Sequence, residues 1–230
     1  MVSAASWVRL LKKGTLAAGM VLMFVSTINV SSNIARSDYQ EKKIAEIEGY
    51  LPSIRETIKT DVSRRAAIAK IMGIIEKYNA DLEHKFKQTI AIEIYEMSLK
   101  YQNLDIDLIC ATITHESAKT WRHDIVSPAG AMGLMQIMPY TGLDLSEPEG
   151  IKWTTPEQVL YNPIYNIRMG CRYLSSLIDE YHLDGGLAAY NGGVRQAQKW
   201  LASGRKDDVL VAETREYVPA VLKLYINFKN

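Results

Sequence analysis

Glu116 is the residue of this sequence whose surroundings best suit acid–base chemistry. Before it, apolar residues recur at helical spacing at Ile106, Ile109, Cys110 and Ile113, which places them on one buried face of a helix. Glu116 then lies beside that face at the carboxyl end of the helix. The helix dipole and the apolar surroundings both disfavour a carboxylate there, so both raise the pKa of Glu116. A carboxylic acid that is protonated near neutral pH can act as a general acid.

The alternative is an ordinary solvated glutamate at a helix end, and the helix by itself favours this simpler interpretation. Asp105 or Asp107 is a suitable N-cap for the helix. A polar loop follows it, and a short Met-rich segment with one glutamine then occupies residues 132–138. The choice between the two interpretations depends on the rest of the chain.

The composition excludes several classes of function. The chain has 230 residues, of which 47% are hydrophobic, and its 27 basic and 26 acidic residues give a net charge of +1. Because this balance lacks a basic excess, we expect no nucleic-acid partner. The sequence has no glycine-rich phosphate loop and no Cys/His cluster with metal-ligand spacing, so we expect neither a metal nor another cofactor. Cys110 and Cys171 are expected to be buried free thiols, although an exported domain permits a disulfide.

The amino-terminal segment, residues 1–35, has the pattern of an export signal or a membrane anchor. An uncharged run at 14–30 follows three basic residues, Arg9, Lys12 and Lys13. This run is long for a signal-peptide core and short for a membrane span, which needs about 20 residues. Ala35 could end a cleavage site, but Asn33 does not fit the small-residue pattern, so an uncleaved anchor is favoured over a signal peptide or a buried helix. We expect the rest of the chain to be exported, to the periplasm or the outer face of the cytoplasmic membrane.

Residues 36–101 have the pattern of charged helices without identifiable chemistry. One heptad-like seam passes through Ile44, Ile47, Leu51, Ile54 and Ile58, and a second through Ile68, Ile71, Ile75, Tyr78 and Leu82. Gly49 and Pro52 interrupt the first seam, so we expect the helix to break or kink there. Both seams are short, which favours a helical hairpin packed on the main domain. A stalk or a partner-binding coiled coil is the alternative.

Residues 102–230 show mainly helical periodicity and weak strand signals, so we expect a compact all-α domain of several short helices. Gly-rich turns separate the helices at 128–133, 185–186 and 192–193, with a short helix expected at 187–190. Asn162 is placed to cap a helix that begins with Pro163. The last helix is expected over about 213–228, with Pro219 in its first turn or so.

An ordered set of motifs runs through this last part of the chain. The motifs are Glu116-Ser117; 130–139, which reads GAMGLMQIMP; Asn162-Pro163 with Asn166-Ile167, Gly170 and Tyr173-Leu174; 188–193, which reads AAYNGG; and 213–218, which reads ETREYV. This set resembles the soluble lytic transglycosylase family, whose catalytic domain has a lysozyme-like fold. The resemblance covers about 104–225, roughly half of the chain, and does not include the first hundred residues. The expected architecture is a lysozyme-like catalytic domain preceded by a helical segment and an amino-terminal apolar helix.

The resemblance implies an enzyme that acts on peptidoglycan glycan strands. Such an enzyme cleaves the β-1,4 bond between N-acetylmuramic acid and N-acetylglucosamine and leaves a 1,6-anhydro end. Glu116 takes the catalytic position, first as the acid that protonates the leaving oxygen and then as the base on the C6 hydroxyl. One carboxylate is sufficient because the substrate supplies its own nucleophiles, whereas hydrolysis usually needs a second carboxylate.

The resemblance also implies the residues that bind substrate, which are Ser127, Met135, Gln136, Met138, Tyr190, Asn191 and Tyr217. Met135 and Met138 could pack against a sugar face or belong to the core. Ser127 could bind substrate or cap a turn, and Asn191 could bind substrate or end a helix. Tyr217 could hold or polarise Glu116.

Two features leave alternatives open. The loop at 118–126 is about two residues longer than is usual in the family, and its Trp121, like Tyr140 further on, could be a sugar platform or lid packing. A muramidase would need a second acid, for which Asp124, Asp144 and Glu213 are candidates, although Glu213 has the position of an orienting residue at a helix start. A non-catalytic wall-binding module that keeps the fold is the third alternative.

Overall fold

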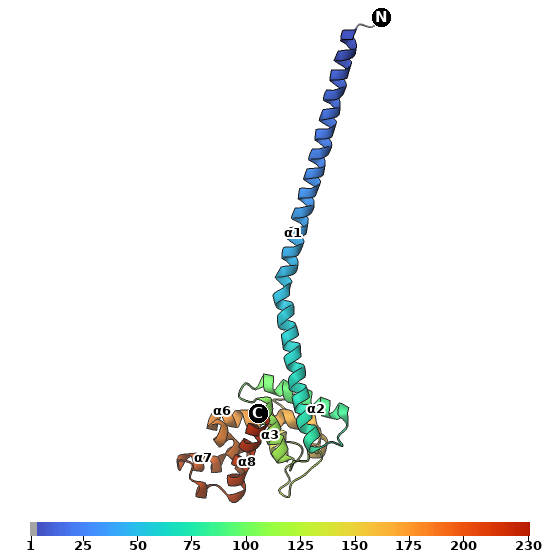
Figure 1. Ribbon diagram of the computed structural model, residues 1–230. Helices are drawn as coiled ribbons and strands as arrows, with labels where there is room; N and C mark the ends of the chain where they lie inside the picture. Colours follow the sequence, from blue (N-terminus) through green and yellow to red (C-terminus); the bar gives the residue numbers. More distant parts are fainter. Residues whose placement is uncertain (1–3) are drawn as a thin grey trace. The chain divides into compact units, whose positions relative to one another are not determined.

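The computed structural model describes the backbone of residues 4–230, and the side chains from residue 23 onwards except those of 25, 28, 30 and 32–35. The elements, in chain order, are α1 (Ala4–Tyr78), α2 (His84–Lys100), α3 (Ile106–Glu116), α4 (Pro139–Ser146), α5 (Pro156–Leu160), α6 (Pro163–Gly192), α7 (Val194–Ala202), the 3-10 turn η1 (Asp207–Val209) and α8 (Ala212–Lys229) (Figure 1). Over the described residues β-structure is limited to two isolated bridges, Val126–Met132 and Met132–Ile137. The predicted all-α class is therefore confirmed.

The chain divides into two compact units, Met1–Asp61 and Val62–Asn230. The first unit consists of the larger part of α1, which continues through Gly49 and Pro52. A break at these residues is therefore wrong, whereas the kink, the other form of the prediction, stays a prediction. Proline cannot donate the helical hydrogen bond to the carbonyl four residues earlier, so the bonds on either side of that gap hold the helix.

The predicted signal or anchor falls mostly outside the described side chains, because those of 14–22, 25, 28 and 30 are among the omitted ones. Among the described residues, no helix combines the length and the apolar character that a membrane span requires.

The second unit begins with the end of α1, which forms an antiparallel hairpin with α2. Ile71 of α1 and Ile90 of α2 are fully buried, so the second predicted seam packs into the core. Lys87, only 4% exposed, crosses the hairpin to form an ion pair with Glu76 and donates to the carbonyl of Ala80 at 2.6 Å. The hairpin is thus part of the same compact unit as the helices that follow.

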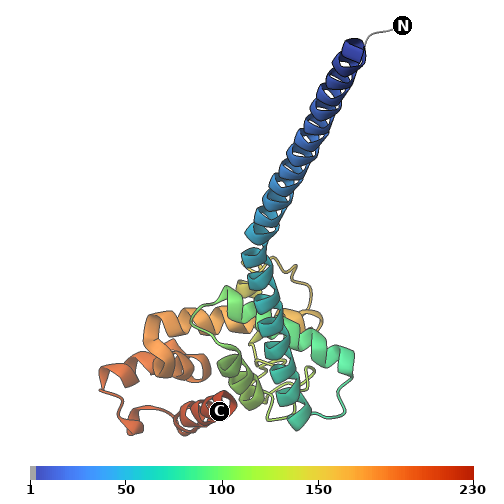
Figure 2. The same cartoon turned by 45° about the horizontal axis from the view of Figure 1, so that its top comes forward.

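Helix α3 lies in the interior of this unit, and all its residues from Asp107 to Thr114 are buried. Asp105 is the N-cap, because its side chain accepts from the N–H of Leu108 at 2.9 Å. Asp107, the other predicted candidate, lies inside the helix and pairs with Lys70 at 2.7 Å. Helix α8 lies beside α3, as Figure 2 shows for the red and the green helix, and the long helix α6 contacts α2, α4, α5, α7 and α8.

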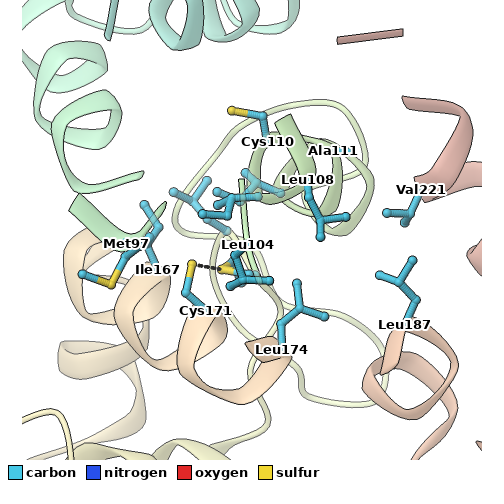
Figure 3. Packing of buried hydrophobic residues seen from close by; sticks show 14 of the residues in the cluster. Met97, Leu104, Leu108, Cys110, Ala111, Ile167, Cys171, Leu174, Leu187 and Val221 are labelled. Atoms are coloured by element: carbon cyan, nitrogen blue, oxygen red, sulfur yellow. Dashed lines mark hydrogen bonds between the residues drawn. The ribbon is translucent and has the colours of Figure 1, made fainter. Parts of the chain in front are cut away.

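The two cysteines are both free and buried, as the sequence predicts. They belong to different helices, Cys110 to α3 and Cys171 to α6 (Figure 3). The Cys171 sulfur lies 4.0 Å from the sulfur of Met135. A Cβ at Gly170 would overlap the Met135 side chain, so the glycine before Cys171 is what lets this methionine pack against α6.

Helix α6 begins as predicted, with the Asn162 side chain accepting from the N–H groups of residues 164 and 165 and with Pro163 at the first helical position. The separate helical segment predicted before the glycines at 192–193 is confirmed, but the turn predicted at 185–186 is wrong, because the break lies earlier. The chain kinks at His182, which has φ 62° and ψ 179°, and the two glycines that suggested a turn lie inside the helix. They are required for close packing, because a Cβ at Gly186 would come within 2.7 Å of Ile178.

Helix α8 begins one residue before the predicted start. Pro219 therefore lies in the helix interior rather than in the first turn, which corrects that prediction. The proline is exposed, and the helix continues past it to Lys229.

Asn166 of α6 fixes the Met-rich segment 132–138. Its Oδ1 accepts from the N–H of Met135 at 2.7 Å, and its Nδ2 donates to the carbonyls of Met132 at 2.9 Å and Leu160 at 3.0 Å. Gly133, which has φ 81°, permits the approach because a Cβ there would overlap the Asn166 amide. A single buried amide thus holds the loop that carries Gln136.

We predict that Asn166→Leu lowers the free energy of unfolding by roughly 3 kcal/mol, because it keeps the volume but removes three buried hydrogen bonds. Of the three backbone groups, the Met132 carbonyl keeps a second donor, the N–H of Ile137 at 3.0 Å. Urea unfolding measures the change. The control Ser176→Ala, on the exposed face of the same helix, should change the stability by less than about 0.5 kcal/mol. Equal losses for Asn166→Leu and Ser176→Ala would contradict this role.

Candidate active site

Glu116 is the last residue of α3 and is half-buried. Its Oε1 accepts a hydrogen bond of 2.7 Å from the hydroxyl of Tyr217. Burial raises the pKa of Glu116 from 4.5 to about 7; the Tyr217 hydrogen bond opposes this, and the negative charge of Glu213 adds to it. The structure thus agrees with the raised pKa predicted from the sequence and assigns its largest cause to desolvation.

Tyr217 reaches Glu116 from the opposing helix α8. It is 2% exposed, and burial followed by the charge of Glu116 raises the pKa of its hydroxyl well above the ordinary value. The ring of His115 meets it edge-on, with 4.8 Å between ring centroids. The tyrosine therefore stays protonated and can serve only as a donor to the carboxylate.

Tyr190 joins the end of α6 to the Met-rich segment. Its hydroxyl donates to the carbonyl of Met135 at 2.8 Å, and its ring lies 5.5 Å from that of Tyr173. Burial and then the negative charge of Glu116 raise the pKa of Tyr190. The charge of Glu116 thus raises the pKa of both tyrosines, Tyr190 and Tyr217.

A cavity of about 260 Å³ lies between the Met-rich segment and the end of α6. Its walls are formed by Gln136, Ile137, Met138, Tyr140, Thr141, Tyr173, Ala189, Tyr190, Asn191, Gly192 and Gly193. Four of the predicted binding residues are therefore brought together here, namely Gln136, Met138, Tyr190 and Asn191. Tyr140, a candidate sugar platform, is 68% exposed at this wall.

Gln136 is held by the loop that it belongs to. Its backbone has φ 49°, and its Nε2 donates to the carbonyl of Gly133 at 2.8 Å. Asn191 is half-buried, and its enclosed Oδ1 has no hydrogen-bond partner among the residues that the structure describes. Such an acceptor suits the N–H of a bound acetamide or a hydroxyl group.

The other predicted residues lie elsewhere. Met135 is fully buried, so the core alternative holds for it, and it contributes its carbonyl to the site. Ser127 caps the turn before the Met-rich segment, its hydroxyl accepting from the N–H of Ala131 at 3.0 Å. Trp121 cannot be a sugar platform, because it is 0% exposed and its indole N–H donates to the Thr114 hydroxyl at 3.1 Å; lid packing is the correct interpretation.

The candidate second acids differ in their relation to Glu116. Asp124 is engaged with Arg122 through two bonds of 3.0 and 2.9 Å, which lowers its pKa. Asp144 is exposed. Glu213, in the first turn of α8, is exposed and affects Glu116 only through the smallest of the three causes of its shift.

Sequence reasoning missed the structural role of Asn166, His115 and Tyr173. The signal for Asn166 was present, since an amide in an apolar helical stripe must find buried partners. Within the described part of the chain, no group of three or more His, Cys, Asp or Glu side chains is placed to hold a metal ion.

The pKa of Glu116 predicts a pH dependence of stability. Its folded-state pKa lies above the ordinary value, so its contribution is complete below about pH 4.5 and is lost as the pH rises through about 7. In Glu116→Gln the side chain stays neutral at every pH. Between about pH 4.5 and 7 the free energy of unfolding of the wild type should therefore fall by about 2–3 kcal/mol more than that of the variant. Urea unfolding over this pH range tests the difference, and parallel profiles would refute it.

The hydrogen bond from Tyr217 predicts the effect of its removal. Because this bond favours the carboxylate, Tyr217→Phe should raise the pKa of Glu116 above about 7. The matched control is Tyr225→Phe on the same helix, whose hydroxyl donates to Asp105 at 2.7 Å. A carbon-13 NMR titration of the Glu116 carboxyl should show the shift in the first variant and not in the second; an unchanged titration in both would oppose the assigned role.

The sequence is similar to one protein-family model and to several known enzymes. The Transglycosylase SLT domain model matches residues 93–209, which is half of the chain. The soluble lytic murein transglycosylase of Escherichia coli (strain K12) is 37% identical over 123 residues, covering 49% of this chain and 19% of that protein. The membrane-bound lytic murein transglycosylase C of Glaesserella parasuis is 38% identical over 89 residues, covering 38% of this chain and 24% of that protein.

Solved structures give the same result. An inactive mutant of lytic transglycosylase Slt from Pseudomonas aeruginosa aligns with a TM-score of 0.53 and 28% identity over 64% of this chain and 24% of that one. The 70 kDa soluble lytic transglycosylase from Escherichia coli aligns with a TM-score of 0.52 and 25% identity over 72% of this chain and 29% of that one. The chain thus spans only about a quarter of the length of these relatives. The family model matches half of the chain, and the all-α fold is lysozyme-like, as in the solved relatives. This chain therefore belongs to the transglycosylase SLT domain family.

Proposed function

We propose that this chain is a peptidoglycan lytic transglycosylase that cleaves the β-1,4 bond between N-acetylmuramic acid and N-acetylglucosamine. The observation that carries the proposal is the state of Glu116, a half-buried acid with a pKa of about 7 that is hydrogen-bonded to Tyr217. An acid with this pKa is populated in both protonation states near neutral pH, so it can give a proton in one step and take one in the next. The names of the relatives agree with this assignment.

The proposed first step is protonation of the glycosidic oxygen by Glu116. The bond from C1 of N-acetylmuramic acid to that oxygen breaks, the N-acetylglucosamine end leaves as an alcohol, and C1 becomes oxocarbenium-like. The N-acetyl group of the substrate stabilises C1. The new carboxylate on Glu116 is stabilised by the hydrogen bond from Tyr217, which is 2.7 Å long before the proton leaves.

The proposed second step returns the proton. The Glu116 carboxylate takes it from the C6 hydroxyl, and O6 bonds to C1 to close the 1,6-anhydro ring. No water is consumed, so the products together have the composition of the substrate. The cavity walls supply Gln136, Asn191 and Met138 to hold sugar groups, while Tyr190 fixes the segment that carries two of them. Ser127 shapes the preceding turn.

The same proposal includes the cell envelope as the place of action. A wall polymer is reached only from outside the cytoplasm, and the basic residues before the apolar run 14–30 fit export with either a cleaved signal or an uncleaved anchor. The membrane would then be a second partner if the segment is retained. The relatives include both soluble and membrane-bound enzymes by name.

The test is product analysis on intact peptidoglycan. The wild type should release anhydro ends, and Glu116→Gln should lower their rate of release by about a hundredfold or more, because a neutral amide cannot transfer the proton. The wild-type rate should fall as the pH rises above about 7. An unchanged rate in Glu116→Gln would remove Glu116 from the mechanism.

Variants of the candidate second acids distinguish a lytic transglycosylase from a muramidase, which is a hydrolase. Glu213→Gln removes the acid whose charge reaches Glu116, and Asp124→Asn removes an exposed acid in the loop after α3. Both variants should keep the anhydro products. Mass spectrometry of the ends decides the reaction type, since hydrolysed ends are heavier by one water; such ends, lost in Glu213→Gln, would establish a muramidase. Wall binding with no cleavage by the wild type would establish the non-catalytic module.

A further inference from the structure

An apolar seam on the first unit is exposed along its whole length. Its residues are Ile44, Ile47, Leu51, Ile54 and Ile58, which are between 41% and 58% exposed. The seam at 68–75 on the same helix has the same periodicity but is buried by the second unit, to which it belongs. Large aliphatic residues on one stripe of a helix normally have a partner surface, so the question is which partner this stripe suits.

The spacing of the seam is that of a coiled coil. Steps of three and four place Ile44, Leu51 and Ile58 at positions a, and Ile47 and Ile54 at positions d. The outward positions b, c and f carry no large aliphatic or aromatic side chain between 42 and 60; they are occupied by Lys42, Ala45, Glu46, Gly49, Pro52, Ser53, Glu56, Lys59 and Thr60. The two residues that suggested a break therefore lie on the outer face, where they leave the seam intact.

The charges beside the seam select the partner and its direction. From 36 to 58, positions g carry Arg36, Lys43, Tyr50 and Thr57, and positions e carry Glu41, Glu48 and Arg55. In a parallel, in-register pair, position g faces position e of the next heptad in the other chain, which pairs Arg36 with Glu41 and Lys43 with Glu48 of a second copy. An antiparallel pair sets g against g and e against e. Arg55 could then meet a glutamate at position e, but Arg36 and Lys43 would have no anion to face, because no position g from 36 to 57 is acidic.

We propose that the seam Ile44–Ile58 binds the same segment of a second copy of this chain in a parallel coiled coil. Lys43 forms an ion pair within its own helix, with Glu46 at 3.0 Å, and both side chains are about half exposed. Exposed pairs of this kind contribute little, so Lys43 is available for exchange with Glu48 of the other copy. Isoleucine or leucine at a with isoleucine at d favours three or four strands over two, and the measured mass sets the number of copies. The inference does not depend on the catalytic proposal.

Sedimentation of the full chain, in mild detergent over a wide concentration range, tests the association. The wild type should show a concentration-dependent mass that is an integral multiple of the monomer. Ile47→Glu/Ile54→Glu should abolish the multimer, and the matched outer-face variant Ala45→Glu/Ser53→Glu should retain it. A monomeric wild type, or equal loss in both variants, would overturn the proposal.

Two further variants test the direction. With Cys110 and Cys171 buried, Ile44→Cys should form an intermolecular disulfide with itself under mild oxidation, because residue 44 faces its own copy only in a parallel pair. A disulfide formed only when Ile44→Cys is mixed with Ile58→Cys would mean an antiparallel pair and would overturn the proposal. Lys43→Glu and Glu48→Lys should each weaken self-association about tenfold, and their mixture should restore it; no restoration would also count against it.

Discussion

The structure depends on one hydrogen bond between helices that are far apart in sequence. The Tyr217 hydroxyl and the Glu116 carboxyl meet at 2.7 Å although the two residues are 101 positions apart. Burial alone would favour a neutral carboxyl so strongly that the anion would be a poor product of proton transfer. The hydroxyl opposes burial, and the result is a pKa of about 7 rather than one far above or below neutrality. Helix α8 matters because it supplies the donor, Tyr217, and the charge of Glu213 that adds to the rise in pKa.

Two tyrosines fix α8 against α3. Tyr217 donates to Glu116 at the carboxyl end of α3, and Tyr225 donates to Asp105, the N-cap residue at the amino end. A helix held at two points cannot slide or rotate without breaking one of these bonds, so the Glu116 side chain has a defined donor. On the other side of the site, Asn166 and Tyr190 hold the backbone of Met135 through its N–H and its carbonyl. The cavity is thus formed by elements fixed through hydrogen bonds rather than by flexible loops.

The sequence predicts the elements that depend on local chemistry and mispredicts those that depend on packing. The N-caps Asp105 and Asn162 and the start of α3 follow from capping and periodicity. The glycines at 185–186 have the pattern of a turn, but they allow helix segments to approach closely at Ile178 and Leu201, which only the tertiary structure reveals. Trp121 has the pattern of an exposed loop residue, but its indole N–H finds Thr114 in the interior. For the site, the pKa direction of Glu116 could be inferred, but not the identity of the atoms that balance it.

Helix α1 shows the limit of periodicity as evidence. Two seams with the same spacing follow one another along this helix; Ile71 and Ile75 are fully buried, whereas Ile47 and Ile54 are at least half exposed. The spacing of the apolar residues shows that one face of the helix is apolar. The charged residues beside that face indicate which surface packs on it. Beside the buried seam, Lys70 and Glu76 find partners within the second unit, in Asp107 and Lys87. Beside the exposed seam, Arg36 and Lys43 lie on one flank, and Glu41 and Glu48 lie on the other flank together with Arg55. Two parallel copies can pair Arg36 with Glu41 and Lys43 with Glu48 across the apolar stripe.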